Sequence, residues 1–333
     1  MKFKIKKNST YVIAEIGNNH EGSFYRAKKM IDLVAKTGAN AVKFQTFKTD
    51  KFIKNNQKKN FLKKFEISYE NFEKLKDYSH KNKLNFISTP LDIESAKFLG
   101  KICDAIKISS GDNNFLKLIE ICLEFNKSLI ISMGFLNHYE TEKTINKIIK
   151  LFPFNKISKK ISFLHCVSSY PVNYKNANLK RITYLKQRWP KLSFGYSDHT
   201  IGIEACLAAK MLGAEIIEKH FTLDKNFSNF RDHALSADVK DMKNIVSGIK
   251  KIEQMTSKYS KLLSNDENKN KKIVRRHPFA AKDLKIGEKI DLNNVKFLRP
   301  EKSLVPINPE FFIGRKLKKN ISINSLIKKS DII

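Results

Sequence analysis

Short apolar runs alternate with longer amphipathic segments along most of the chain, from residue 11 to about residue 256. The runs are rich in Val, Ile and Phe, which is typical of strands that are buried on both faces of a sheet. We expect strands at 11–17, 41–47, 85–90, 105–111, 128–134, 161–169, 192–198 and 215–222. Between them, stretches such as 23–37 and 202–213 have the spacing of amphipathic helices, and Gly213 is a natural helix stop.

Eight strands that alternate with helices predict the α/β class and, within it, a (β/α)8 TIM barrel over residues 1–256. A doubly wound parallel sheet is the alternative, but no G-x-G-x-x-G sequence follows the first strand. Residues 257–274 are polar and rich in Lys and Asn, which favours a linker. The pattern then changes to short strands and turns, so residues 275–333 are expected to form a small β-rich domain.

The formal net charge of +31 raises the question of a polyanionic partner, because such a charge is typical of proteins that bind nucleic acid. The basic residues are 56 Lys and only 8 Arg, however, and they are spread along the whole chain. Arg-rich or aromatic-interleaved patches, which nucleic-acid binding favours, are absent from the sequence. We therefore expect lysine to fill solvated faces and expect no nucleic-acid partner. Non-specific adhesion to anionic surfaces is the alternative that stays open.

No apolar run approaches the ~20 residues that a membrane-spanning helix needs, so no membrane partner is expected. The basic start is followed by a short apolar run that Glu15 interrupts, which indicates a first strand and not a signal peptide. The cysteines are far apart in apolar stretches, at Cys103, Cys122, Cys166 and Cys206. They are expected to be buried free thiols, which fits a cytoplasmic location.

Two lysines interrupt otherwise apolar runs. In a TIM barrel the active site forms at the carboxyl ends of the strands, and Lys43 and Lys107 fall at positions predicted to point into the barrel. A buried ammonium group is costly unless an anion compensates its charge. Hydroxyl side chains are expected around them, at Thr89, Ser110, Ser132 and Ser197. Singly, each of these residues would be a helix cap or a solvated side chain, but together they predict a site for a phosphate plus a carboxylate.

Two histidines, His199 and His220, end the seventh and eighth predicted strands. Adjacent strands lie ~4.8 Å apart, so both imidazoles can reach one metal ion at ~2.1 Å. The alternative is that each imidazole merely forms hydrogen bonds at the rim of the barrel. Imidazole with oxygen ligands suits Mn2+, Fe2+, Co2+ or Zn2+, and the residues alone do not choose among them. Glu218 lies on the same face of its strand as His220.

Seven segments, in order, resemble the motif series of the sialic acid synthases, a family that includes the legionaminic and pseudaminic acid synthases. The segments are AEIGNNHEGS (14–23), VKFQT (42–46), FISTP (86–90), IKISSGD (106–112), HCVSSYP (165–171), YSDHTIG (196–202) and IEKHFT (217–222). In the tail, AAKDLKIGE (280–288) and FLRP (297–300) are similar to the antifreeze-like (SAF) domain that follows the barrel in this family. The resemblance covers nearly the whole chain, and seven ordered motifs are far more specific than one.

The resemblance implies that the chain condenses phosphoenolpyruvate (PEP) with an open-chain N-acyl mannosamine-type sugar, giving a nine-carbon sialic-type acid and phosphate. In this reaction the C3 methylene of PEP attacks the C1 aldehyde of the sugar, water adds at C2, and phosphate leaves with C–O cleavage. The positions that match the PEP-binding residues of the family are Lys43, Thr89, Lys107, Ser110, Ser132 and Ser197. His199 and His220 match the ligands of a divalent cation, typically Mn2+ in the family.

The resemblance also implies catalytic and sugar-binding residues. Glu15, Asp198 and Tyr170 are expected to be catalytic, and Glu15 is the best candidate for proton handling. The sugar-side positions match Gln45, Asp112, Tyr170, Asp232 and Arg299. Arg299 matches the arginine that the C-terminal domain places over the active site of the other subunit. The family therefore implies a domain-swapped homodimer.

Three departures from the family pattern lie on the sugar side. Residues 109–112 read S-S-G-D where G-S-G-E is common, Ser168 replaces a frequent Asn, and the loop at 226–236 replaces the usual P-G-P-D. They leave the acceptor sugar open, although an unphosphorylated sugar is expected. The segment 231–236, with Asp232 and His233, is nearer to the sialic and legionaminic branches than to the pseudaminic one.

Two other hypotheses compete with this one. The first is a related PEP-condensing synthase of the octulosonate-phosphate or heptulosonate-phosphate type, against which the tail and the H-C-x-S-x-Y-P run argue. The second is a non-catalytic basic barrel that binds a polyanion, with a steep salt dependence. Release of phosphate from PEP separates the enzymes from the binding protein.

Overall fold

A computed structural model describes residues 3–6, 9–151, 153, 160–230, 232–257 and 259–333. The chain divides into two compact units, Met1–Ser257 and Lys258–Ile333. Within the described residues no helix is long and apolar enough to cross a membrane. All four cysteines are free and buried, as the sequence predicts.

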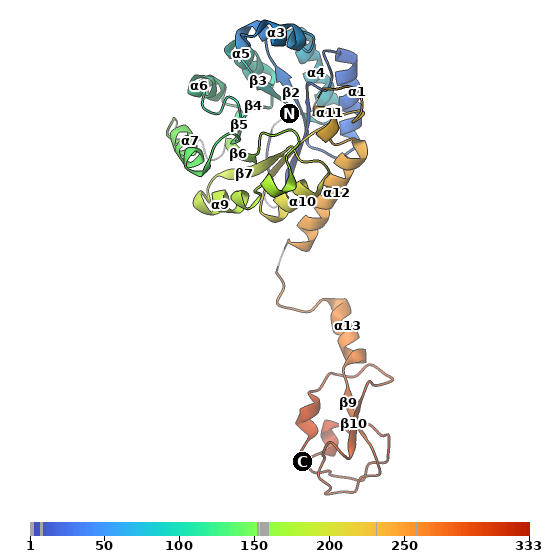
Figure 1. Cartoon of the computed structure of the whole chain (residues 1–333). Coiled ribbons are helices and arrows are strands. Elements are labelled where there is room, and N and C mark those ends of the chain that lie inside the picture. The colour runs from blue at the N-terminus through green and yellow to red at the C-terminus, as the bar shows by residue number, and fades with distance from the viewer. Residues whose placement is uncertain (1–2, 7–8, 152, 154–159, 231, 258) are drawn as a thin grey trace. The chain divides into compact units, whose positions relative to one another are not determined.

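The first unit is a closed barrel of eight strands, paired in parallel in sequence order, with helices around it (Figure 1). The strands are β1 Tyr11–Gly17, β2 Ala41–Thr46, β3 Asn85–Pro90, β4 Ala105–Ile108, β5 Ser128–Ser132, β6 Ile161–Cys166, β7 Ser193–Asp198 and β8 Ile216–His220. The predicted (β/α)8 barrel is confirmed, because β8 pairs with β1 and closes the sheet. An open doubly wound sheet is excluded for the same reason. Several predicted strands were too long at their carboxyl ends, where the chain turns into the loops of the site.

Helices follow the strands around the barrel (Figure 1). They are α1 Phe24–Ala35, α2 Thr49–Phe52, α3 Asn56–Lys63, α4 Tyr69–Lys81, α5 Ile93–Ile102, α6 Leu116–Glu124, α7 His138–Lys150, η1 Tyr174–Asn176, α9 Lys180–Arg188, α10 Glu204–Met211, α11 Asp232–Leu235 and α12 Val239–Met255. Polar residues define their starts: Ser23 and Asp238, for example, accept hydrogen bonds from backbone amides in the first turns of α1 and α12.

Alternation along the strands builds two apolar layers. One lies between the sheet and the helices and includes Val42 and Phe44 of β2, which the sequence predicts to face outward. The other fills the barrel interior toward the amino ends of the strands, with residues such as Ile13 and Ile87. Nearer the carboxyl ends the inward positions change to buried polar and charged side chains, beginning with Glu15. The apolar layer therefore forms the floor of a polar cavity.

The second unit contains α13 Asn265–Val274, β9 His277–Ala280, β10 Val295–Leu298, η2 Pro309–Phe312 and η3 Lys329–Asp331. Strands β9 and β10 are antiparallel, and a small apolar cluster that includes Leu284 and Phe312 forms the core. Within the predicted linker at 257–274, the second half forms the helix α13. Ser264 caps this helix, and acidic residues in its first turn and lysines in its last turn complement the helix dipole.

Candidate active site

A cavity of about 190 Å³ opens at the carboxyl ends of the barrel strands. Its wall combines charged, hydroxyl and imidazole side chains that the eight strands and the loops after them carry. The lining residues are Glu15, Lys43, Gln45, Thr89, Leu91, Lys107, Ser109, Ser110, Gly111, Ser132, Phe135, Cys166, Ser168, Tyr170, Ser197, His199, Glu218 and His220. Most residues that the sequence assigns to PEP, sugar and metal thus lie around one space.

Two lysines and two glutamates form a buried charge network at the base of this cavity. Lys43 Nζ lies 2.8 Å from Glu15 Oε1 and 3.7 Å from Glu218 Oε2. Lys107 Nζ lies 3.3 Å from Glu218 Oε1, which also accepts a hydrogen bond of 2.9 Å from Ser197 Oγ. All four charged side chains are at most 6% exposed. Glu218 therefore links the two inward ammonium groups that the sequence predicts.

Burial and charge shift the pKa values of this network in opposite directions. Burial, opposed by the ammonium group of Lys43 and reinforced by the negative charge of Glu218, raises the pKa of Glu15 above its ordinary value. Although burial opposes the effect, the ammonium groups of Lys107 and Lys43 lower the pKa of Glu218 to about 2. Burial lowers the pKa of Lys107. Glu218 is thus the fixed negative charge of the site, and Glu15 is the group poised to titrate.

Sequence reasoning placed Glu218 on the face of His220 but gave it no role. The signal was present, because an acidic residue interrupts an apolar strand at an inward position just as Lys43 and Lys107 do. Two inward cations need inward compensation when no ligand is bound, and Glu218 and Glu15 supply it.

Hydroxyl groups surround the lysines on the side of β3, β4 and β5. Lys43 Nζ donates to Thr89 Oγ1 at 3.3 Å. Ser132 Oγ is buried and has no hydrogen-bond partner among the described residues, so it is available to a ligand. Ser110 Oγ accepts a hydrogen bond of 3.1 Å from the backbone amide of Gly134. The set of donors matches the expected phosphate or carboxylate.

Gly134 allows the loops after β4, β5 and β6 to meet at this point. A Cβ atom on Gly134 would lie 2.4 Å from Ser168 Oγ and 2.5 Å from Ser110 Oγ, well inside van der Waals contact. The side chain of Asn113 ties the loops together by donating to the carbonyl groups of Ser132 (3.2 Å) and Gly134 (2.9 Å). Sequence reasoning assigned neither Gly134 nor Asn113.

The two predicted metal ligands lie side by side, with the ring centroids of His199 and His220 5.4 Å apart. Nδ1 of His199 is 2.9 Å from the carbonyl oxygen of Val167, which assigns the proton to Nδ1 and leaves the Nε2 lone pair for a cation. Nδ1 of His220 is buried and has no hydrogen-bond partner in the part of the chain that the structure describes. Burial and the neighbouring His199 lower the pKa of His220 well below its ordinary value, so this imidazole is neutral.

These observations fit a divalent cation held by two imidazoles, with its other ligands taken from solvent or substrate. Among the described residues no group of three or more His, Cys, Asp or Glu side chains is arranged to hold a metal. A site with two imidazoles therefore leaves positions open for a substrate.

The predicted sugar-side residues are only partly brought together. Gln45 and Tyr170 line the cavity, and Gln45 Nε2 lies 3.3 Å from Glu15 Oε1. Asp112 accepts a hydrogen bond of 2.6 Å from Ser109 Oγ, and Asp232 is buried at the start of α11. Of the segment 231–236, the structure describes residues 232–236. Arg299 is exposed directly after β10 in the second unit.

Asp198 is the exception among the residues predicted to be catalytic, because its side chain does not line the cavity. Its neighbours Ser197 and His199 face inward, so strand alternation sends Asp198 to the opposite face. There its Oδ2 atom lies 2.8 Å from Lys219 Nζ, and neither side chain is more than 1% exposed. The structure therefore places Asp198 behind the cavity wall, and its catalytic role stays a prediction.

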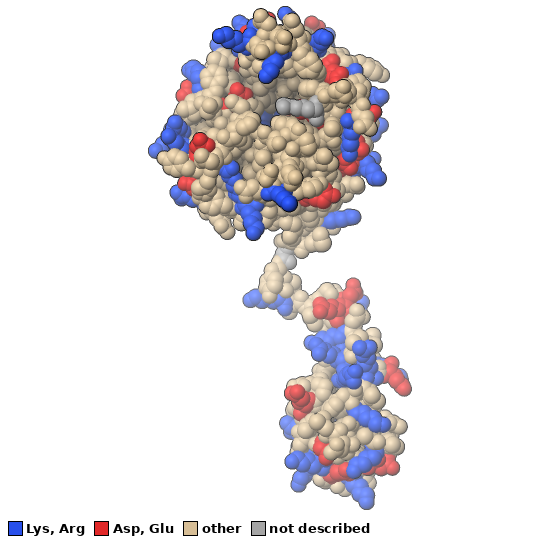
Figure 2. Space-filling model, viewed as in Figure 1, with Lys and Arg blue, Asp and Glu red and all other residues tan. Residues whose placement is uncertain are grey.

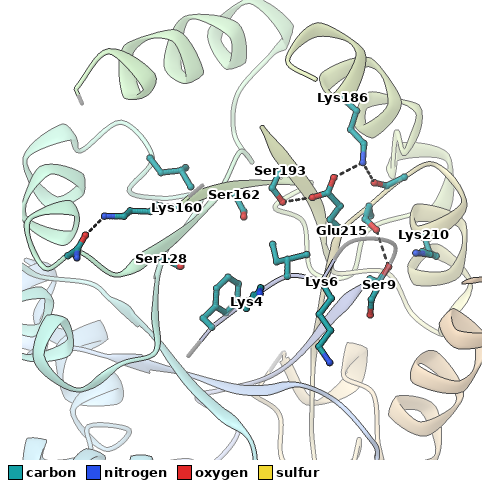
Figure 3. Close-up of a pocket in the computed structure, with 17 residues that line it drawn as sticks. Lys4, Lys6, Ser9, Ser128, Lys160, Ser162, Lys186, Ser193, Lys210 and Glu215 are labelled. Atoms are coloured by element: carbon teal, nitrogen blue, oxygen red, sulfur yellow. Dashed lines mark hydrogen bonds and ion pairs between the residues drawn. The ribbon is translucent and has the colours of Figure 1, made fainter. Parts of the chain in front are cut away.

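A larger cavity of about 1020 Å³ lies at the amino ends of the strands, and Lys4, Lys6, Lys186 and Lys210 are among its lining residues (Figure 3). Two of these lysines already have carboxylate partners in Glu215 (2.7 Å) and Glu253 (3.1 Å). The conserved geometry of TIM barrels places chemistry at the other end, where the inward lysines and imidazoles are. We therefore assign the active site to the smaller cavity.

Charges of both signs are mixed on the visible face of the barrel unit. Figure 2 shows Lys and Arg scattered over the visible face of the barrel unit among acidic and uncharged residues, and not gathered into one basic patch. The scatter agrees with the prediction that lysine fills solvated faces.

A TIM barrel whose carboxyl end holds buried lysines, hydroxyl groups and two neighbouring imidazoles, followed by a small β-rich domain, defines a class of two-domain barrel proteins. Within this class the chain belongs to the NeuB family, which it matches over residues 30–261. Residues 279–333 match the SAF domain, so the predicted family and tail are both confirmed.

Curated relatives and solved structures agree with this assignment. The N,N'-diacetyllegionaminic acid synthase of Campylobacter jejuni is 36% identical over 337 residues, which cover 96% of this chain and 99% of the relative. A pseudaminic acid synthase of the same species is 32% identical over 340 residues, which cover 96% of each chain. The crystal structure of N-acetylneuraminic acid synthetase from Leptospira borgpetersenii has a TM-score of 0.73 and 34% identity, and the match covers 80% of this chain and 92% of that one.

Proposed function

We propose that the chain condenses PEP with an open-chain N-acyl mannosamine-type sugar to form a nonulosonic (sialic-type) acid and inorganic phosphate, in surface glycan biosynthesis. The observation that carries the proposal is the pair of inward ammonium groups, Lys43 and Lys107, beside the unpartnered hydroxyl of Ser132. Relatives that match almost the full chain are named synthases of legionaminic and pseudaminic acids, which supports a reaction of the same type.

PEP brings a phosphate and a carboxylate into a cavity whose buried charges balance: two ammonium groups against two carboxylates. The substrate oxygens compete with Glu218 and Glu15 for the ammonium groups, and the hydroxyls of Ser110, Ser132 and Ser197 become donors to the phosphate. Lysine suits this task because its three donors can serve a carboxylate and a substrate oxygen together.

In the condensation, C3 of PEP forms a bond to the aldehyde carbon, and the aldehyde oxygen takes up a proton and becomes a hydroxyl. Water adds at C2 and releases a proton, and the C2–O bond to phosphate breaks. A divalent cation held by His199 and His220, with Mn2+ as the first choice, would supply Lewis acidity toward the aldehyde. Glu15 is the proposed proton carrier, because its raised pKa favours proton exchange and its Oε2 atom has no hydrogen-bond partner among the described residues.

The proposal is tested by phosphate release from PEP with and without an acceptor sugar. The panel contains N-acetylmannosamine, its 6-phosphate and the two diacetamido-trideoxyhexoses, each with Mn2+ and with EDTA. We expect acceptor-dependent phosphate release and a nine-carbon acid product by mass spectrometry. The matched control is Lys107→Met, which keeps an unbranched side chain of nearly the same length and removes its charge. PEP hydrolysis without an acceptor, or no turnover with any acceptor, would reject the reaction.

We further propose that the active form is a homodimer in which Arg299 reaches the partner's cavity. Complementation tests this directly, because Arg299→Ala subunits and Lys107→Met subunits are each expected to be inactive. In a swapped dimer, mixing and reassociating them restores one working site per heterodimer, or about a quarter of the original activity. Mixtures that stay inactive while heterodimers form would show that each tail serves its own barrel.

A further inference from the structure

A buried ion pair lies directly behind the two imidazoles. Asp198 and Lys219 are register partners on β7 and β8, and each immediately precedes one of the two histidines. Their side chains are 0% and 1% exposed, and Lys219 Nζ is 2.8 Å from Asp198 Oδ2. Both point away from the cavity because His199 and His220 point into it. The site does not use either charge directly.

Every polar atom of this pair is engaged. Asp198 accepts hydrogen bonds from the Thr200 amide (2.9 Å), the Tyr196 hydroxyl (3.0 Å), the Thr200 hydroxyl (3.2 Å) and Cys206 Sγ (3.4 Å). Lys219 donates in addition to the carbonyl oxygen of Thr200. The contacts span the residues on both sides of His199, so its backbone is held between two anchored neighbours.

The ion pair lies where the pairing of β7 and β8 ends. Asp198 and Lys219 are the last partners in the register of β7 and β8, so the pairing of the two strands stops just before the imidazoles. Beyond that point His199 is held through Val172, whose amide donates to the His199 carbonyl, while the Ala237 amide donates to the His220 carbonyl. These contacts lead to different loops and do not join the histidines to each other. The ion pair is a direct side-chain link between the two strands on the face away from the cavity, and the hydrogen bond from Ser197 to Glu218 (2.9 Å) is its counterpart on the cavity face.

We propose that the Asp198–Lys219 pair sets the spacing of His199 and His220 and thereby the affinity of the site for a divalent cation. The inference rests on the cation site of the proposed function and assigns positioning residues to it. A buried ion pair contributes little net stability compared with apolar residues of similar size, so stability alone does not account for its presence at this position. Supports behind metal ligands typically change metal affinity about 10- to 100-fold when they are removed.

The test is a titration of the metal-free protein with Mn2+, in which electron paramagnetic resonance measures free Mn2+. We expect Asp198→Asn and Lys219→Met each to weaken Mn2+ binding about 10- to 100-fold, while the affinity for PEP, measured without metal, changes less than threefold. Lys219→Arg, which can keep the pair, should restore most of the Mn2+ affinity. These readouts separate positioning from a general loss of folding, because only the folded fraction binds PEP.

Glu215→Gln is the matched control, since Glu215 precedes β8 at its other end and pairs with Lys186 at 2.7 Å. It should lower thermal stability without changing Mn2+ affinity. The inference would be overturned if folded Asp198 and Lys219 variants had an Mn2+ affinity within twofold of that of the unmodified protein. It would also be overturned if Glu215→Gln lost as much Mn2+ affinity as they do. If the unmodified protein turns over PEP and sugar but does not bind Mn2+, the inference fails and the condensation stands. If it binds Mn2+ but releases no phosphate, the proposed reaction fails and the inference can still hold.

Discussion

Replacing Glu218 by Gln removes the carboxylate that both buried lysines share. Glutamine keeps the volume and an acceptor for Ser197, so the change is mainly the loss of one buried negative charge. Lys107 loses its charged partner at 3.3 Å, and Lys43 keeps Glu15 at 2.8 Å. Breaking a buried pair from one side typically costs about 3–5 kcal/mol, because the remaining charge is uncompensated. For a domain of this size that corresponds to a fall in melting temperature of roughly 6–20 °C.

A bound anion should reverse this loss. The cavity of Glu218→Gln carries an excess positive charge, so phosphate or PEP replaces the missing carboxylate and stabilises the folded state by mass action. The assay is thermal unfolding in chloride and in phosphate at equal ionic strength, for the unmodified protein, Glu218→Gln and the control Glu215→Gln. We expect phosphate to raise the melting temperature of Glu218→Gln more than that of the other two.

The same variant should respond to pH in a defined way. Because the pKa of Glu218 in the fold is lowered to about 2 from an ordinary value of 4.5, its stabilising effect is complete above pH 4.5 and is lost as the pH falls toward 2. The difference between the two proteins should therefore shrink as the pH falls from 4.5 toward 2. A variant as stable as the unmodified protein in chloride, or one that phosphate does not favour, would refute the compensation argument.

Three further predictions concern stability at acid pH, the loops that meet at Gly134, and removal of the divalent cation. Burial lowers the pKa of His20 to about 3 and of His165 to about 4, so between pH 6.5 and 4 these two histidines bind up to two more protons in the unfolded chain than in the folded one. Together they should lower the free energy of unfolding by up to about 2.7 kcal/mol per pH unit, and His20→Asn should remove about half of this contribution. Equal slopes for the two proteins in urea titrations would contradict this. Gly134→Ala should weaken PEP binding at least tenfold because its Cβ meets two serine hydroxyls, whereas Gly111→Ala, whose Cβ makes only ordinary contact at 3.5 Å, should bind normally in calorimetry. EDTA should abolish phosphate release and Mn2+ should restore it, and activity that survives exhaustive chelation would remove the cation from the proposal.

Much of the fold and part of the site follow from local pattern. A side chain's face on a strand depends only on a two-residue repeat, so sequence alone placed Lys43 and Lys107 inside the barrel and Val42 and Phe44 outside. The same repeat sends Asp198 outward, between the inward Ser197 and His199. Its predicted catalytic role followed the family motif and disregarded this alternation. Strand order also followed from the sequence, because short βα connections favour neighbours in sequence as neighbours in the sheet.

Distances across the barrel were decided only by the tertiary structure. Lys107 and Glu218 are 111 residues apart, and their 3.3 Å contact depends on closure of the sheet and on the tilt of its strands, which no local pattern reports. Closure also makes Glu15 of β1 the register partner of His220 of β8, which joins the proposed proton carrier to the cation site. The sequence therefore determined which side chains enter the cavity. The closed barrel decided which of them meet, because a contact between distant strands depends on the geometry of the whole sheet.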